Sequence, residues 1–389
     1  MAKKTNYQIE KSDWISSFTL IGKPKISDYT FDIDAQSNSS SYVYNRMRLN
    51  VDCGTTCGTV QCEMMGGYFE EQPSKIYVHG KNEDGTDNFD KKVTVDWEDR
   101  LDEDVLSQIG DRSFLVVGLK RTTKGKRFDQ KFLSPYDAIA YIKDNLNDEM
   151  TIRVSGRLSY SMYQGNVQVR KNVTSITLYD KTDPSEYTAK FTQTMLLDKN
   201  SIDPNAIDTT NNIAHLDVRI LDYLKEFNGK EVKGQFPFSK QVELPFKDMN
   251  AFKAMCQVGL KVKKNITQAT FDGLLIEGGA VVKATWDDVP PNIRVLVDAG
   301  WYTREQAMAL CSASSGRELR FSITNISVDR QENGDLMIAT PRIYPDRYTE
   351  EDLVLPCMMD EDEVSEENIV TNDAVSSASA VDTSWLNNI

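Results

Sequence analysis

The feature that most constrains the fold is a pair of long alternating segments, residues 150–163 and 167–179, joined by the turn Gln164-Gly165-Asn166. Apolar and polar side chains alternate through the first segment, and this period of two is typical of a strand with one buried face. Gly165 suits a tight turn. The sequence therefore predicts an antiparallel hairpin, with Gly156 marking a bulge or bend in its first strand.

A helix is expected before this hairpin, and further strands before the helix. Ser134 is a suitable N-cap for residues 134–145, Pro135 fits the first turn, and apolar residues recur on one face. Residues 17–26 and 41–51 have the composition and alternation of strands. The predicted order is strands, one helix and a closing hairpin.

This order resembles an OB-fold, whose closing half is such a hairpin. The positions that carry the resemblance are Phe18 to Gly22 in a first strand and the following positions in the hairpin: Val154, Gly156, Gly165, Asn166, Val173, Ile176 and Leu178. In this respect the sequence is similar to single-stranded DNA-binding proteins, in particular the larger ones of bacteriophages. The resemblance implies an OB-fold barrel, here with a long insertion at about residues 66–133.

The domain organisation follows from these segments. We expect an OB-fold-like domain over residues 1–185, a second mixed-β domain over 186–352 and a disordered acidic tail over 353–389. The second domain should contain strands near 215–221, 271–282 and 319–327, and helices near 248–258 and 303–313. The predicted fold class is mostly β with helical insertions: an OB-fold barrel with elaborations plus a second mixed-β unit.

The negative charge of the chain is concentrated at its C-terminal end. Formal net charge is −14, but eleven acidic residues lie between Glu350 and the last residue, and no Lys or Arg follows Arg347. Such a segment buries too little apolar surface to fold alone. Its end carries an apolar tip, so a docking segment and a merely solvated terminus are both open interpretations. The residues expected to bind partner proteins are Asp360, Glu361, Asp362, Glu363, Trp385, Leu386 and Ile389.

Basic residues gather between positions 117 and 171, within a chain that is otherwise acidic. Single strands are bound by cations that follow the phosphates and by aromatic faces on which bases stack. Basic runs are also common on solvated surfaces, and tyrosine is common in strands. The residues predicted to contact DNA are Lys120, Arg121, Lys124, Lys126 and Arg127 in a basic loop, and Arg153, Arg157, Tyr160, Tyr163, Arg170 and Lys171 in the hairpin. Tyr44 and Phe128 are further candidates for stacking.

The sequence offers little support for catalysis, a metal or a cofactor. Its two histidines, His79 and His215, lack a recognisable acid–base or metal spacing, and it contains no phosphate-binding glycine loop and no dinucleotide fingerprint. Cys53, Cys57 and Cys62 could hold a metal with His79, but structural thiols are the better interpretation of this spacing. We expect no metal and no cofactor, and a binding protein rather than an enzyme.

The favoured function is binding and protection of single-stranded DNA in phage replication and recombination, without sequence preference. The resemblance to single-stranded DNA-binding proteins implies that the acidic tail recruits a polymerase, helicase or recombinase. Two alternatives remain open: a β-rich structural protein of a phage particle, and an OB-fold adaptor that binds no nucleic acid. No apolar run is long enough to cross a membrane and no signal peptide is evident, so we expect a cytoplasmic location, in the host if the chain is viral. The oligomeric state is left open.

Overall fold

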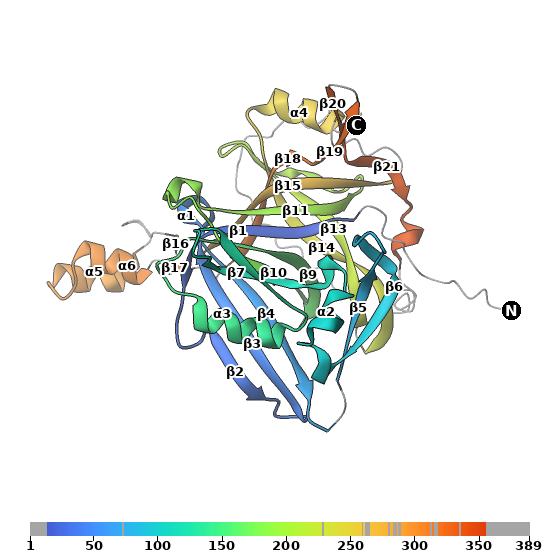
Figure 1. Cartoon of the computed structure of the whole chain (residues 1–389). Helices are drawn as coiled ribbons and strands as arrows, with labels where there is room; N and C mark the ends of the chain where they lie inside the picture. The colour runs from blue at the N-terminus through green and yellow to red at the C-terminus, as the bar shows by residue number, and fades with distance from the viewer. Residues whose placement is uncertain are drawn as a thin grey trace.

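The structure is a computed structural model. It describes residues 14–354 apart from positions 72–73, 228, 259, 261–264, 279–280, 283–285, 287–288, 312, 315–317 and 334–335. The chain is mostly β with helices inserted, as predicted (Figure 1). The helices are α1 (Gly54–Cys57), α2 (Glu103–Ser107), α3 (Pro135–Asn145), α4 (Met249–Val258), α5 (Pro291–Asp298) and α6 (Arg304–Cys311).

The strands of the first half are β1 (Ser16–Lys25), β2 (Phe31–Gln36), β3 (Tyr42–Asp52), β4 (Thr59–Phe69), β5 (Lys75–Lys81), β6 (Asp87–Asp96), β7 (Leu115–Arg121), β8 (Arg127–Phe132), β9 (Ile152–Tyr163) and β10 (Asn166–Leu178). Those of the second half are β11 (Thr188–Leu197), β12 (Ile202–Asp208), β13 (Ile213–Phe227), β14 (Lys230–Pro245), β15 (Ile266–Gly278), β16 (Val281–Val282), β17 (Ala313–Ser314), β18 (Glu318–Ile326), β19 (Val328–Asn333), β20 (Leu336–Pro341) and β21 (Ile343–Tyr348).

Fifteen of the described strands form one mixed sheet, and the others form the pairs β5–β6, β16–β17 and β19–β20. Within the large sheet, the pairings of the first half return to their starting strand. β1 pairs with β3, β3 with β4, β4 with β10, β10 with β9, and β9 with β1. All of these pairs are antiparallel except β4–β10, which is parallel and consists of the single pair Glu63–Asn172. We call this set of five strands the first ring.

The second half repeats the same order. β11 pairs with β13, β13 with β14, β14 with β18, β18 with β15, and β15 with β11. Again only the pair between the third and fifth strands, β14–β18, is parallel. A helix stands between the third and fourth strands of each set, α3 in the first and α4 in the second. We call β11, β13, β14, β15 and β18 the second ring.

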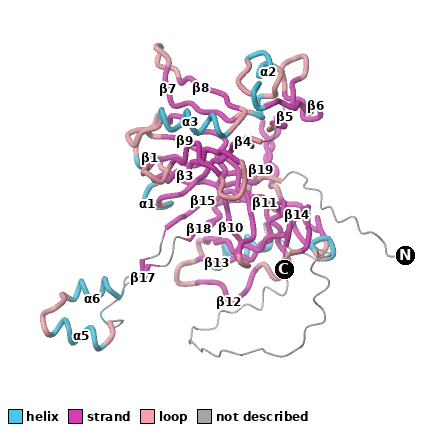
Figure 2. Tube along the Cα trace, turned by 90° about the horizontal axis from the view of Figure 1, so that it is seen from below, coloured by secondary structure: helices cyan, strands magenta, loops and turns pink. Residues whose placement is uncertain are grey.

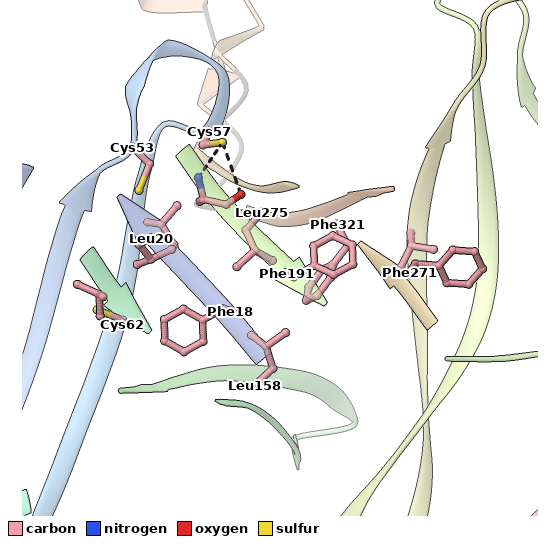
Figure 3. Packing of buried hydrophobic residues seen from close by; sticks show 14 of the residues in the cluster. Phe18, Leu20, Cys53, Cys57, Cys62, Leu158, Phe191, Phe271, Leu275 and Phe321 are labelled. Carbon is pink, nitrogen blue, oxygen red and sulfur yellow. Dashed lines mark hydrogen bonds between the residues drawn. The ribbon is translucent and has the colours of Figure 1, made fainter. Parts of the chain in front are cut away.

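The two rings are joined by antiparallel pairing of β1 with β11, in which Phe18 lies opposite Phe191. The buried hydrophobic residues around this seam form one continuous cluster that includes both rings (Figure 3). Phe191 packs against Phe321 with ring centroids 4.9 Å apart. Because the sheet and the core both continue across β1 and β11, the rings share one body.

The local sequence signals explain the elements of the first ring. The Ser134 hydroxyl accepts a hydrogen bond from the backbone N–H of Tyr136 at 3.1 Å, which confirms the predicted N-cap of α3. Gln164 and Gly165 have φ angles of 48° and 76°, so the turn of the β9–β10 hairpin uses left-handed backbone as expected. The hairpin has a bulge beside Gly156, but on its second strand and not on its first as predicted: the register shifts between Val173 and Ser175, so the extra residue is Thr174 of β10.

The insertions lie outside the rings. β5, β6 and α2 carry a small core of their own, and β7–β8 extends the sheet beside β10. α5 and α6 lie apart from the sheet in both views (Figures 1 and 2). No helix in the described ranges is long and apolar enough to cross a membrane. The predicted acidic tail lies outside the described residues from position 355 onward.

Candidate functional site

The predicted basic loop is a β-hairpin formed by β7 and β8, and its cations are partly neutralised. The Arg121 guanidinium pairs with Asp180, and that of Arg127 binds Asp129 with two hydrogen bonds of 2.6 and 2.8 Å. These partners hold the pKa of both carboxyls below their usual range. Lys120 lies 5.1 Å from the ring centroid of Tyr141.

Lys124 and Lys126 lie on the turn of this hairpin, and both are exposed. Neither ammonium group has an ion-pair or hydrogen-bond partner among the described residues. Thr122 N–H donates to the Lys126 carbonyl at 2.7 Å, and Gly125 has a φ of 76°, so the segment folds as a tight turn and not as an open loop. These two lysines are therefore the free cations of the hairpin.

The β9–β10 hairpin brings a different group of predicted residues to the surface. Arg153 and Arg157 are exposed on the outward side of β9, and neither has a hydrogen-bond or ion-pair partner in the described part of the chain. Tyr163 is 61% exposed at the start of the β9–β10 turn. Because β7 pairs with β10 near Ser175 to Thr177, the basic hairpin lies at the opposite end of β10 from Tyr163.

Two of the predicted contacts are wrong. Tyr160 is 4% exposed, its hydroxyl donates to Gln193 at 3.1 Å, and burial raises its pKa well above the usual value. Its ring therefore has no face available to a base. Lys171 is 6% exposed, and its ammonium lies 3.1 Å from the Glu277 carboxylate of the second ring. Tyr160 faces inward because it lies two residues after Leu158 and therefore on the same side of β9. Lys171 is covered where the two rings meet.

The strand register places the other hairpin residues beside residues of β3 and β4. Arg157 lies opposite Asn172, Asn172 opposite Glu63, and Glu63 opposite Arg48, so one row crosses β9, β10, β4 and β3. Arg170 lies two residues from Asn172 on the same side, with Nε 3.8 Å from Glu63 Oε1. The outward sides of these four strands therefore form one surface, which we call the β3–β4–β10–β9 face.

A groove of about 700 Å³ lies on this face. Its walls include Tyr42, Arg46, Met65 and Arg170. The Arg46 guanidinium is held by Asp32 of the neighbouring β2, with Nε 2.8 Å from the carboxylate oxygen. Arg46 is thus fixed in place while it lines the groove. Arg170, in contrast, is more than half exposed.

Aromatic side chains continue this face beyond the groove. Tyr42 and Tyr44 are stacked, with centroids 6.0 Å apart and planes at 18°, and Tyr42 also contacts Phe69 at 4.9 Å. Phe69 is 44% exposed. Such rings and guanidinium groups can hold flat aromatic ligands that carry negative charge.

Most of these β3 and β4 residues were absent from the sequence prediction. Tyr44 was named as a stacking candidate, but Tyr42, Arg46, Met65 and Phe69 were not. The alternation in residues 42–48 places both tyrosines and both arginines on one side, and this signal was sufficient to find Tyr42 and Arg46. Nothing in the sequence indicated that β10 would join β4 through the single pair Asn172–Glu63. Phe128, the other candidate, is 47% exposed on β8, on the basic hairpin.

Arg157 also borders a second pocket, of about 490 Å³, at the junction of the rings. The other walls include Trp14, Leu221, Asp222 and Arg342. Asp222 accepts a hydrogen bond from the Tyr160 backbone N–H at 2.8 Å, which links β13 to β9. Arg157 therefore stands between the β3–β4–β10–β9 face and the second ring.

The cysteines and His79 do not come together. Cys53, Cys57 and Cys62 are buried in the common core, and Cys57 Sγ accepts a hydrogen bond from the Ala189 N–H at 3.3 Å (Figure 3). His79 belongs to the β5–β6 sheet, where its ring nitrogens contact Ser113 and Asp87. Across the described ranges, no group of three or more His, Cys, Asp or Glu residues could hold a metal ion.

The predicted tail contacts from Asp360 to Ile389 lie outside the described residues. The comparisons with known proteins assign no family: no family model matches this chain, and no curated protein is similar to it in sequence.

Proposed function

We propose that the first ring is an OB-fold barrel and that the chain binds single-stranded DNA on the β3–β4–β10–β9 face, as a binding protein rather than an enzyme. The ring order, its one parallel pair and the helix before the last two strands support the fold assignment. OB-folds bind oligonucleotides on the face of their second and third strands, which here correspond to β3 and β4.

The observation that carries the proposal is the groove on this face, where aromatic and guanidinium groups lie together. Tyr42, Tyr44 and Phe69 offer ring faces, and Arg46 and Arg170 lie within reach of a backbone that follows the groove. Stacking tolerates any base, and cation contacts follow phosphates, so this chemistry favours single strands without sequence preference. The unpaired Arg153, Arg157, Lys124 and Lys126 would add long-range attraction.

The proposed biological role is coating of single strands in replication and recombination of a bacteriophage. In this proposal the acidic tail, with its apolar end, recruits a replication protein.

The test is fluorescence anisotropy with a labelled oligo-dT at low and high salt. We expect binding that weakens steeply with salt. Tyr163→Ala should weaken binding by about 1–3 kcal/mol, since a stacked base is worth that amount. Tyr77→Ala is the matched control, because Tyr77 is 78% exposed but belongs to the separate β5–β6 sheet. Absence of binding at low salt would overturn the proposed function.

A further inference from the structure

Short sequence motifs recur at matching places in the two rings. The third strands contain Thr59-Val60-Gln61-Cys62-Glu63 and Ser239-Lys240-Gln241-Val242-Glu243. The fifth strands contain Arg170-Lys171-Asn172-Val173-Thr174-Ser175-Ile176 and Arg320-Phe321-Ser322-Ile323-Thr324-Asn325-Ile326. The first strands share Phe-Thr, at positions 18–19 and 191–192. The parallel pairs match as well, since Glu63 lies opposite Asn172 and Glu243 opposite Ser322.

The same packing arrangement of a phenylalanine and a glycine occurs in each ring. Phe18 lies opposite Gly156, and Phe191 lies opposite Gly273. A Cβ at Gly156 would lie 2.0 Å from the Asn172 carbonyl oxygen and 2.8 Å from the Phe18 ring. At Gly273 it would lie 2.3 Å from the Ser322 carbonyl oxygen and 2.5 Å from the Phe191 ring. In both rings a phenylalanine of the first strand thus packs over a glycine of the fourth.

The bulge beside each glycine is repeated in detail. The register shifts at Thr174 in the first ring and at Thr324 in the second. The Thr174 hydroxyl donates to the carbonyl of Ser155 at 3.3 Å, and that of Thr324 to the carbonyl of Asp272 at 3.1 Å. Each acceptor is the residue before the glycine. Agreement of sequence, register and side-chain bonding indicates that the rings are copies of one unit.

The copies are related by an approximate two-fold axis. Phe18 and Phe191 hold equivalent positions and face one another in the antiparallel β1–β11 pair, as the two copies do at an isologous dimer interface. Contacts between the rings follow this symmetry. Gly58 of the first ring bridges Glu277 of the second, and the equivalent pair, Phe238 and Tyr160, lie with ring centroids 6.1 Å apart.

The side-chain pairs on the outward side of the first ring are partly repeated on the second, where Glu243 and Ser322 are buried. Glu63 lies near Arg170 at 3.8 Å, and Glu243 binds Arg320 at 2.8 Å. The row Arg157, Asn172, Glu63, Arg48 corresponds to the row Leu274, Ser322, Glu243, His215. The second ring also has a groove, of about 520 Å³, which is lined by Arg219, Ser239 and Gln241 on the outward side of β13 and β14.

We propose that the chain is a covalent pseudo-dimer with two strand-binding faces, the second on β13 and β14 of the second ring; this rests on the proposed function of the first. Tyr223, 55% exposed on the outward side of β13, offers a stacking surface there. Arg219 offers a guanidinium, which Asp198 and Glu350 now hold; its two terminal nitrogens each lie 3.0 Å from a Glu350 carboxylate oxygen. On the first face a phosphate competes with one carboxylate for Arg46, that of Asp32, whereas on the second face it competes with two for Arg219, so the second face binds more weakly than the first.

The test uses an oligo-dT of about eight nucleotides, within the length that one OB-fold covers, and counts bound strands per chain by native mass spectrometry and calorimetry at low salt. The full-length protein should bind two strands with unequal affinity. Gln61→Glu and Gln241→Glu place a negative charge at equivalent positions, and each should weaken one of the two binding events on the order of tenfold. Gln241→Lys should strengthen the weaker of the two binding events. A gain in affinity cannot result from loss of folding, so this variant separates the effect of charge from that of misfolding.

The outcomes separate the two proposals. The chain could bind one strand only, with an affinity that Gln61→Glu lowers and that neither change at Gln241 alters. This result would overturn the proposal of a second binding face and leave the proposed function standing. No binding by the unmodified chain would overturn both. The midpoint of thermal unfolding is measured for each variant. A midpoint unchanged from that of the unmodified chain establishes that a change in affinity arises at the binding surface and not from a loss of folding.

Discussion

Glu277 is a buried carboxylate of the second ring that binds groups of the first. Its Oε2 lies 3.1 Å from Lys171 Nζ and accepts a hydrogen bond from the Gln61 backbone N–H at 3.0 Å. Both side chains are less than a tenth exposed. A buried pair of this kind adds little net stability, but removing one partner leaves an uncompensated charge.

Lys171→Met should therefore lower the free energy of unfolding by about 3–5 kcal/mol. Lys171→Met with Glu277→Gln should recover most of this loss, because the unpaired charge is gone. Lys181→Met is the control: that lysine pairs with Glu186 at the surface and should cost at most about 1 kcal/mol. Urea denaturation measures all three. Equal effects of Lys171→Met and Lys181→Met would contradict the role of burial.

Buried thiols should make the fold sensitive to alkali. Burial raises the pKa of Cys62 to about 12, above the ordinary value of about 8.5. The thiol keeps its proton in the folded chain and loses it on unfolding, so its stabilising effect is complete below about pH 8.5 and is lost as pH rises toward 12.

Cys62→Val should reduce the slope of unfolding free energy against pH, between about pH 9 and 11, by about 1.4 kcal/mol per pH unit. Valine is suitable because Val242 occupies the equivalent position in the second ring. Denaturation series at several pH values give the two slopes. An unchanged slope would mean that Cys62 ionises as readily in the folded chain as in the unfolded one.

Neighbouring strands approach each other closely at Gly156 and Gly273, the two glycines that lie under phenylalanine. Gly156→Ala and Gly273→Ala should each lower the free energy of unfolding by about 1–3 kcal/mol, because the added methyl group overlaps a backbone carbonyl oxygen. Gly278→Ala is the matched control on β15, since a Cβ there meets nothing within 4 Å. Denaturant titration compares the three. A large effect at Gly156 with none at Gly273 would show that the rings are not packed alike.

Local elements could be predicted from the sequence because their signals are local. Ser134 and Pro135 mark the start of α3, and the alternation of β9 gives the inward and outward sides correctly. The closing contacts of each ring could not be predicted, because β4–β10 and β14–β18 each join through one residue pair far apart in the sequence. The predictions for Tyr160 and Lys171 failed for another reason. Each residue lies two positions from a buried residue on the same side of its strand, Leu158 for Tyr160 and Val173 for Lys171, so the alternation already placed both side chains inward.

At the scale of the whole molecule, both ends of the described chain meet at one place. Trp14 packs beside a cluster that contains Leu221, Tyr348 and Leu353, and Leu353 is 3% exposed. Residues 355–389 therefore continue from a segment that is anchored on the second ring. A shortened chain has to keep Leu353, because a buried leucine is worth about 2–5 kcal/mol.

A chain that ends at Pro356 meets this condition and tests how the acidic segment acts on binding. Eight of the fourteen net negative charges lie beyond Pro356, so the shortened chain carries a net charge of −6. Because this charge repels phosphates at long range, its removal should strengthen oligo-dT binding on the order of tenfold at low salt, and by less at high salt where the repulsion is screened. The control keeps the full length and replaces the eight carboxylates with their amides. If the amide variant binds as the shortened chain does, charge is the cause; if it binds as the unmodified chain does, the segment acts through its apolar end or its bulk. An affinity that both changes leave unaltered would mean that the segment does not act on the strand-binding faces.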